Sequence, residues 1–360
     1  MKSLWAWIAR NERHLSAVVF LGGFGFDNLA LGRIDLPWVE TLYAGFLVGA
    51  ALLIVLSHFA VEKYGEPTES GRRTISTFLN FGAQFFIGGL LSGCLIFYAR
   101  GAAWNVSWPF IFLLGAVFLA SEFLHSRKER LEFQATLFFL ALYLYAIFAL
   151  PIASGRMGSL IFLASGAASA ILFALFLWLL RLVGEARFMA SIRPIAIRAA
   201  GVLLAINAAY FTGILPPLPL SLQDAGIYHG LVKYGGSYQF QAEDMPPAWQ
   251  FWKTPVLHVV KGTPLYAYSA VFAPVAISTD IVHVWQRRGT YAGSWETVAR
   301  VPFGIAGGRD GGYRGYSTIT DLSPGAWRVT IETESGQVIG RERFDVEDSF
   351  AVPALHTEVK

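Results

Sequence analysis

Apolar residues follow one another in long runs over the first three-fifths of the chain, and this pattern ends near Pro216. A helix needs about 20 apolar residues to cross the roughly 30 Å hydrocarbon core of a bilayer. Helices are favoured over strands here, because open strands leave backbone groups unpaired in lipid. We therefore predict an α-helical transmembrane bundle over residues 1–215. Its seven spans are expected at 15–36, 41–60, 76–98, 104–124, 133–153, 157–182 and 195–215.

From Pro255 onward the pattern changes to an alternation of apolar and polar residues at every second position, which is typical of strands. In "WRVTIETESGQVIGRERFDV" (327–346), Trp327 and Val329 alternate with Arg328 and Thr330, and a Ser-Gly pair indicates the turn. Short runs of this kind predict seven strands, at 256–260, 264–272, 279–287, 295–302, 314–321, 326–333 and 337–346.

Seven short strands separated by Gly, Pro and Asp turns favour an all-β, immunoglobulin-like antiparallel sandwich. We assign it to residues 255–348. Residues 216–254, which are rich in proline and aromatic residues, are then a juxtamembrane linker, and residues 349–360 are a tail.

Composition and charge support a membrane protein. The chain is 54% hydrophobic and only 15% charged, and its mean hydropathy is +0.48, which excludes an ordinary soluble domain. Among the basic residues that flank the predicted helices, only Arg33, Arg100 and Arg156 lie on the side opposite the N-terminus. The positive-inside rule then predicts a cytoplasmic N-terminus and a periplasmic C-terminal domain, in a bacterial inner membrane. The formal net charge of +3 reflects this topology, and no nucleic-acid partner is predicted.

Several C-terminal stretches carry a resemblance. "YSAVFAP" (268–274), "IVHVWQ" (281–286), "GGRDGGYRGYS" (307–317) and "PGAWRVTIETESGQVIGRERF" (324–344) together resemble the bacterial domain-of-unknown-function family 2914. "ILPPLPLSLQDAGIYHGL" (214–231) and the apolar segment are similar to the membrane region that accompanies this domain in many members. The resemblance implies a C-terminal β-domain after a polytopic segment. It implies no activity and no site residues.

The glycine-rich loop "GGRDGGYRGY" matches neither the phosphate-binding loop nor the dinucleotide fingerprint, so no nucleotide cofactor is predicted. Two interpretations remain open. The loop is a turn with positive φ angles, in which Asp310 bonds backbone amides. Alternatively it is a ligand site, in which Arg309 and Arg314 bind a carboxylate or phosphate, Asp310 accepts hydroxyl hydrogens, and Tyr313 and Tyr316 stack on a sugar.

Four tryptophans divide between surface and core. Trp295 and Trp252 are candidates for the same ligand site, although Trp252 also suits the membrane interface or one edge of the sheet. Trp285 and Trp327 alternate with other inward residues on their strands, and are therefore assigned to the core.

Polar side chains inside lipid are expected to face the bundle interior. Asp27 and Asn28 are candidates for a proton or cation relay. Glu122 and His125, three residues apart, form either a local pair, a protonation switch or a solvated helix end. Interhelical hydrogen bonds are the usual role of intramembrane amides, and small residues such as Gly89 and Gly93 allow helices to approach. The amides concerned are Asn80, Gln84 and Asn207.

The chain has no HExxH, CxxC or GxSxG motif, so the sequence predicts no catalytic residue, metal or cofactor, and an enzyme is disfavoured. The leading hypothesis is a protein of the lipid bilayer whose helices carry a β-sandwich that binds an envelope saccharide, lipid headgroup or periplasmic protein. One alternative is a transporter or lipid translocase that uses the intramembrane polar residues, with the β-domain as a gate or capture module. A third is an integral-membrane enzyme acting on a lipid-linked substrate.

Overall fold

The computed structural model describes residues 27, 36–64, 72–123, 130–235, 237–246, 250, 253–275, 277–289, 293–309 and 311–360. The chain divides into two compact units, which are described separately below. The helical unit comprises Met1–Arg100, Pro109–Pro151 and Leu160–Thr212, and the β unit comprises Gly101–Trp108, Ile152–Ser159 and Gly213–Lys360.

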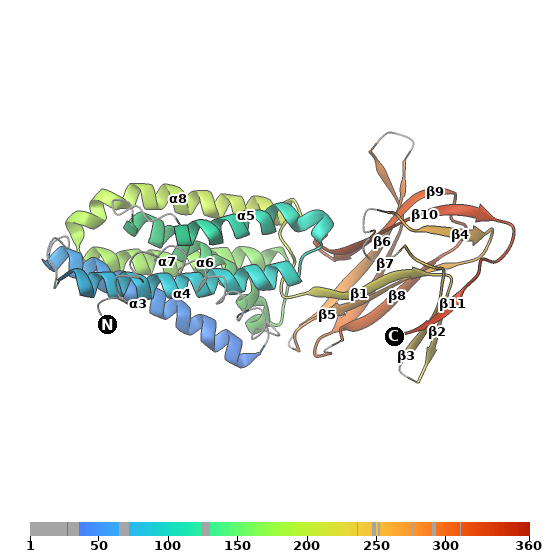
Figure 1. The fold of residues 1–360 in the computed structure, drawn as a ribbon, viewed down its shortest axis with the longest axis horizontal. Helices are drawn as coiled ribbons and strands as arrows, with labels where there is room; N and C mark the ends of the chain where they lie inside the picture. The colour runs from blue at the N-terminus through green and yellow to red at the C-terminus, as the bar shows by residue number, and fades with distance from the viewer. Residues whose placement is uncertain are drawn as a thin grey trace, which may run out of the picture. The chain divides into compact units, whose positions relative to one another are not determined.

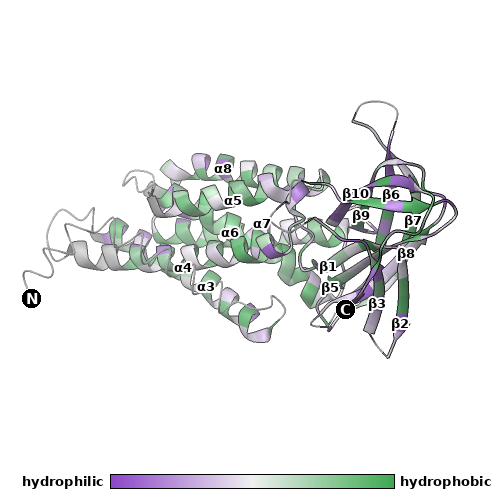
Figure 2. Ribbon diagram, turned by 45° about the vertical axis from the view of Figure 1, so that its right-hand side comes forward, coloured by the Kyte–Doolittle hydropathy of each residue, from purple (hydrophilic) through white to green (hydrophobic). Residues whose placement is uncertain are grey.

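The helical unit contains six long helices within the described residues (Figure 1). They are α3 (Pro37–Tyr64), α4 (Arg72–Arg100), α5 (Trp104–Phe123), α6 (Arg130–Ser154), α7 (Ser159–Val183) and α8 (Glu185–Phe211). All six are long and apolar enough to cross a membrane, and Figure 2 shows their largely hydrophobic colouring. They match the last six predicted spans. The span predicted at 15–36 falls outside the described residues, apart from Asp27 and Leu36.

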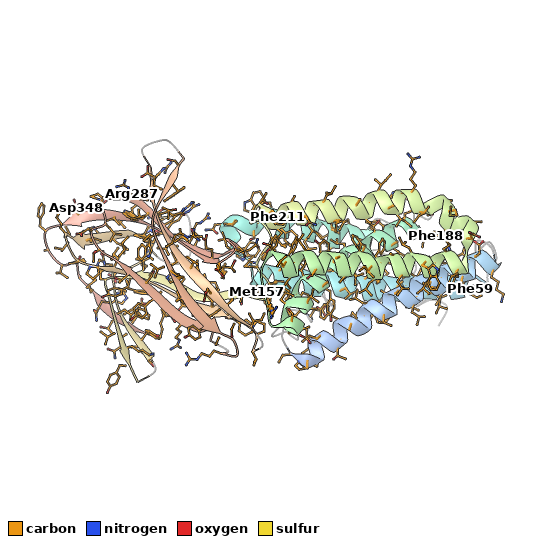
Figure 3. The ribbon with its side chains drawn as sticks, turned by 180° about the vertical axis from the view of Figure 1, so that it is seen from behind. Phe59, Met157, Phe188, Phe211, Arg287 and Asp348 are labelled. Atoms are coloured by element: carbon orange, nitrogen blue, oxygen red, sulfur yellow. The ribbon has the colours of Figure 1, made fainter. Side chains whose placement is uncertain are left out.

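Large apolar side chains cover the outside of these helices. Phe112 is 74% exposed, Leu160 83% and Leu204 71%, and Phe211, labelled in Figure 3, is also exposed. Water would strongly disfavour so much exposed apolar surface. Exposing this surface to hydrocarbon carries no such free-energy penalty. A membrane environment also agrees with the lengths of the helices.

Helices α3 and α4 pack closely because glycines on each helix leave room for aromatic rings of the other. A Cβ atom built on Gly89 would come within 2.5 Å of the Phe46 ring, and one built on Gly93 would overlap the Tyr43 side chain. Gly49 receives the Phe86 ring in the same way. Small residues therefore let the two helices approach, as expected from the sequence at Gly89 and Gly93.

The β unit has eleven strands within the described residues (Figure 1). They are β1 (Ser221–Tyr228), β2 (Gly230–Tyr234), β3 (Ser237–Ala242), β4 (Val256–Val260), β5 (Leu265–Phe272), β6 (Ser278–Arg288), β7 (Trp295–Ala306), β8 (Tyr313–Ile319), β9 (Gly325–Thr333), β10 (Val338–Ser349) and β11 (His356–Val359). Sheet A has the order β1-β5-β8, sheet B β11-β3-β2 and sheet C β4-β10-β9-β6-β7.

The β-rich region is larger than the sequence predicts. Strands β4 to β10 match the seven predicted strands, but β1, β2 and β3 occupy the segment 216–254 that was expected to be a linker, and β11 occupies the expected tail. The pairing also differs from an all-antiparallel sandwich, because β4 runs parallel to β10. The added strands are explained by their aromatic residues: Tyr238 and Phe240 on β3 are buried in the outer face of sheet A.

The main core lies between sheets A and C. Trp285, Trp327 and Phe344 of sheet C pack with Ile227 and Leu265 of sheet A. Trp285 is fully buried and Trp327 is 3% exposed, so the core positions predicted for both tryptophans are confirmed. On its other face, sheet A is covered by sheet B through the cluster Tyr228, Tyr238, Phe240, Ala242, Tyr268 and Ala270.

A polar network crosses the main core. His283 on β6 is fully buried, with its Nε2 2.8 Å from Ser269 Oγ and its Nδ1 2.9 Å from Ser317 Oγ. The indole of Trp285 donates to the same Ser317 oxygen at 2.9 Å. A hydroxyl beside an imidazole is also the arrangement of a hydrolase nucleophile. Burial of His283, Ser269 and Ser317 leaves no access for a substrate, so this network joins the two sheets.

We expect acid to destabilise the β unit through His283. Burial lowers the pKa of His283 from its ordinary 6.5 to about 4. The folded imidazole is therefore neutral between these values, whereas the unfolded one binds a proton. Its contribution is complete above pH 6.5 and is lost as the pH falls toward 4, by about 3 kcal/mol in total. Thermal melts of the full chain in detergent should show this loss, and His283→Gln should flatten it. Equal acid sensitivity in the two proteins would contradict the assignment.

Candidate functional site

The outward face of sheet C carries a group of arginines that we call the arginine face: Arg300 on β7, Arg328 on β9, and Arg341 and Arg343 on β10. Their direction follows from strand periodicity, since successive side chains point to opposite faces of a sheet. Trp327, Val329 and Phe344 point into the core. The neighbouring arginines must therefore point outward.

Strand pairing brings these arginines together. Arg343 lies directly opposite Arg328 in the β10–β9 register, and Arg341 lies opposite Thr330. Arg328 is in turn opposite Gln286 on β6. Residues directly opposite each other in an antiparallel pair have neighbouring side chains on the same face. Three guanidinium groups from two adjacent strands therefore form one patch.

Few negative groups balance this patch. Arg328 Nε donates to Gln286 Oε1 at 2.7 Å, and Arg341 Nε donates to Thr330 Oγ1 at 3.3 Å. Both partners are neutral. Arg300 is paired with Glu332 at 2.7 Å. Arg343 is exposed and has no hydrogen-bond or ion-pair partner among the described residues. Trp295 adds an aromatic surface, because the Arg328 guanidinium lies 4.3 Å from the centre of its ring.

The arginines repel one another. Burial and the charges of Arg341 and Arg343 lower the pKa of Arg328 to about 10. Burial and the charge of Arg343 also lower the pKa of Arg341, and the nearby Glu332 carboxylate opposes them in part. An anion bound over the patch would relieve this repulsion and receive forked donors, which suit carboxylate and phosphate groups.

Arg328, Arg341 and Arg343 are not among the ligand residues predicted from the sequence. The alternation of apolar and polar residues in "WRVTIE" and "GRERF" predicts that these arginines point away from the core. The pairing of β9 with β10, which makes them neighbours, cannot be derived from the sequence. Of the predicted ligand residues, Trp295 lies in this patch, whereas Trp252 lies outside the described residues.

The glycine-rich loop connects β7 to β8, and its glycines have backbone roles. Gly308 and Gly312 have φ angles of 97° and 77°, which favour glycine. A Cβ atom on Gly307 would clash with the backbone oxygen of Pro274. These roles account for the glycines without a ligand. Arg309 is exposed, and Asp310 lies outside the described residues.

The other predicted ligand residues of this region lie on β8 and point in alternating directions. Tyr313 packs against the inner cluster around Val271. Arg314 Nη1 donates to the backbone oxygen of Lys360 at 3.2 Å. Tyr316 is 46% exposed, with its ring 6.4 Å from Tyr238. The structure therefore does not bring Tyr313 and Tyr316 onto one surface.

A buried carboxylate attaches sheet B to β4. Glu243, which follows β3, is 7% exposed. Its Oε1 is 2.6 Å from His229 Nε2 and accepts a hydrogen bond from the His258 backbone N–H at 2.7 Å. Its Oε2 is 2.8 Å from His258 Nδ1. Within the described residues, no group of three or more His, Cys, Asp or Glu side chains is arranged to hold a metal ion.

The intramembrane polar residues form hydrogen bonds between helices. Asn80 Oδ1 on α4 accepts from Ser57 Oγ on α3 at 3.0 Å and from Gln134 Nε2 on α6 at 3.4 Å. Gln84 Nε2 donates to the backbone oxygen of Ser121 on α5 at 3.4 Å. These are bonds of the structural kind expected for such amides.

Two further intramembrane candidates also have partners. Asn207 Nδ2 on α8 is 3.1 Å from the Tyr143 hydroxyl on α6, and Asp27 Oδ2 accepts from Ser92 Oγ on α4 at 2.7 Å. Asn28 and His125 lie outside the described residues, and for Glu122 only the backbone is described, at the end of α5. A relay at Asp27 stays a prediction.

The two units thus define a class: helices apolar enough to cross a membrane, followed by a β-rich region. The sequence profile of the family described as "Protein of unknown function (DUF2914)" matches residues 278–346. The C-terminal region therefore contains a DUF2914 domain, and the resemblance noted in the sequence is confirmed. The matched residues run from β6 into β10, and include all four arginines of the arginine face. No curated protein matches the chain.

Solved structures give no closer guide. A β-glucosidase from Listeria innocua is 15% identical over 28% of this chain and 15% of its own length, with a TM-score of 0.19. The alkylpurine DNA glycosylase AlkC from Pseudomonas fluorescens, bound to DNA containing an abasic site analogue, is 12% identical over 88% of this chain and 100% of its own, with a TM-score of 0.21. The chain thus spans about a seventh of the glucosidase. TM-scores this low carry no argument about fold or function.

We expect alkaline pH to weaken the attachment of sheet B. The hydrogen bond to Glu243 raises the pKa of His258 above its ordinary 6.5. The folded state therefore holds this proton more tightly than the unfolded state. The stabilisation is complete below pH 6.5 and is lost as the pH rises through the raised pKa. The melting temperature of the full chain should fall across this interval, and Glu243→Gln should reduce the slope. Parallel pH profiles for the two proteins would refute the coupling.

Proposed function

We propose that this is a membrane protein of the bacterial cell envelope whose helices anchor a β unit that binds an anionic envelope component. The arginine face carries the proposal. Arg328, Arg341 and Arg343 are held side by side, their hydrogen-bond partners among the described residues are neutral, and their mutual repulsion is relieved by a bound anion. A phosphate or carboxylate on a saccharide or lipid headgroup has the matching charge and geometry.

The proposed topology rests on the number of helices and on the positions of the basic residues. Six described helices and the predicted span at 15–36 give seven crossings, with the N-terminus in the cytoplasm of a bacterial inner membrane. With an odd number of crossings, we propose that the β unit lies in the periplasm, where envelope components are available to it. We propose that its two main sheets, A and C, are an immunoglobulin-like sandwich extended by sheet B, a reading supported by their shared core.

We expect Arg328→Gln to weaken anion binding by roughly tenfold, because a charge-assisted hydrogen bond is lost. The full chain, in nanodiscs of neutral phosphatidylcholine, is titrated with oligogalacturonate, a carboxylated saccharide, and with phosphatidylglycerol vesicles. A neutral dextran oligosaccharide and phosphatidylcholine vesicles serve as references. Binding should prefer the anionic partners and fall as the salt concentration rises.

Arg309→Gln is the matched control, since it removes one positive charge from an exposed loop of the same unit. Binding that is lost in Arg309→Gln and kept in Arg328→Gln would move the site to the glycine-rich loop. Equal binding of anionic and neutral partners would refute anion recognition altogether. Melting temperatures of both variants show whether any loss reflects unfolding.

A further inference from the structure

A cavity opens at the edge of the β unit, between β1 and the first half of β10. Its volume is about 360 Å³, which lies at the small end of the range for small-molecule sites. Ile227, Met245, Pro246 and Phe344 give it apolar walls. Strand β4 pairs only with residues 345–349 of β10. The preceding residues of β10, including Glu342, are therefore free of a β4 neighbour, and the cavity lies beside them.

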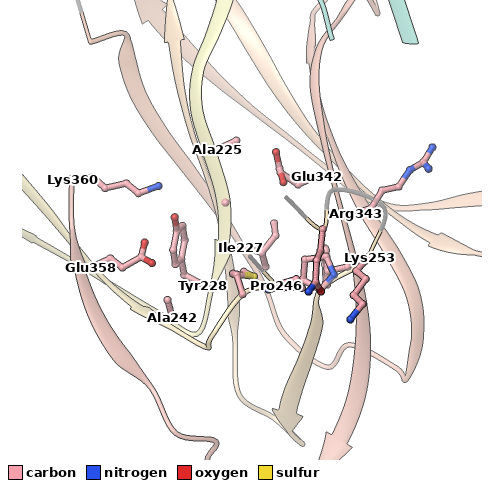
Figure 4. A pocket seen from close by; sticks show the side chains of 15 residues that line it. Ala225, Ile227, Tyr228, Ala242, Pro246, Lys253, Glu342, Arg343, Glu358 and Lys360 are labelled. Carbon is pink, nitrogen blue, oxygen red and sulfur yellow. The ribbon is translucent and has the colours of Figure 1, made fainter. Parts of the chain in front are cut away.

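Glu342 is the chemically distinctive group in this cavity. It is half-buried, and Figure 4 shows its carboxylate turned toward the interior, across from Lys360. It has no hydrogen-bond or ion-pair partner among the described residues. Burial and the charge of Asp224 raise its pKa, and Lys360 opposes this only in part. A half-buried carboxylate without a partner is costly, and a cation bound in the cavity would remove that cost.

The cations around the cavity offset the charge of Glu342 only in part. Lys360 Nζ is held by Asp224 at 2.8 Å and lies 5.5 Å from the centre of the Tyr228 ring. Arg343 and Lys253 also line the cavity, and Figure 4 shows both side chains directed away from Glu342. The remaining charged residue in the lining, Glu358, is negative. Beside the apolar walls, the interior therefore presents the Glu342 carboxylate, which has no ion-pair partner among the described residues.

We propose that this cavity binds a small molecule carrying a protonated amine. The ammonium group pairs with Glu342, and the carbon skeleton of the ligand packs against Ile227 and Phe344. The cavity and the arginine face both include Arg343, but they differ in the charge that they offer a ligand and in the direction of the side chain that would bind it. On β10, Glu342 points between the sheets whereas Arg341 and Arg343, its neighbours, point outward.

The test uses two probes with one skeleton: phenethylamine, and 2-phenylethanol, in which a hydroxyl replaces the ammonium group. Each is titrated by calorimetry at pH 7.5 into the full chain in phosphatidylcholine nanodiscs, with empty nanodiscs subtracted. We expect the amine to bind at least roughly tenfold more tightly than the alcohol. Lowering the pH to 5 should weaken amine binding, because protons compete for Glu342.

Glu342→Gln keeps the shape of the side chain and removes its charge, so it should abolish the preference for the amine. Glu334→Gln, which removes an exposed carboxylate from the turn between β9 and β10, should bind like the wild type. Glu342→Asp keeps the charge on a shorter side chain, so we expect an intermediate affinity for the amine. This variant shows the effect of the charge even if Glu342→Gln does not fold.

Three results would overturn the proposal: no binding of the amine, equal binding of amine and alcohol, or unchanged amine binding in Glu342→Gln. Arg328→Gln should leave amine binding intact. The two proposed sites can therefore fail independently of each other.

Discussion

The packing of Trp285, Trp327 and Phe344 between sheets A and C is the constraint on which the rest of the β unit depends. Large aromatic side chains dominate the burial energy of a core of this size. Because side chains alternate along a strand, a slip of one residue in β9 or β10 would drive arginines into that core. The same register that buries the aromatic rings therefore fixes the positive charges on the outside. It also fixes Glu342 on the inner side of β10, where the sheets no longer cover it completely.

A different constraint organises the helical unit. In lipid, where we propose that these helices lie, no hydrophobic force brings one helix to another, so association depends on close packing and on hydrogen bonds. Both are present: Gly89 and Gly93 receive aromatic rings from α3, and Asn80 joins α4 to α3 and α6. The amides Asn80, Gln84 and Asn207 are thus explained by the assembly of the helices.

The sequence predicted those features that depend on local pattern. Run length identified the helices, and alternation identified β4 to β10 and the burial of Trp285 and Trp327. It failed where partners decide the outcome. Strands β2 and β3 are short, and their aromatic residues resemble a linker in the sequence because only the fold shows that the outer face of sheet A buries them. Arg328 and Arg343 are fifteen positions apart in sequence, and only the β9–β10 register makes them neighbours. The composition of the glycine-rich loop suggested a ligand site, whereas its glycines are explained by positive φ angles and close backbone contacts.

That loop has a consequence for how the domain can vary. It carries the chain from sheet C to sheet A, and Gly307 lies against Pro274 while Gly315, just beyond the loop, lies under the Phe303 ring. Any side chain added at either glycine would wedge apart segments that the core holds together. Arg309, between them, faces open solvent. Among related sequences the positions of Gly307 and Gly315 should therefore keep glycine, whereas the exposed side chain of Arg309 should vary.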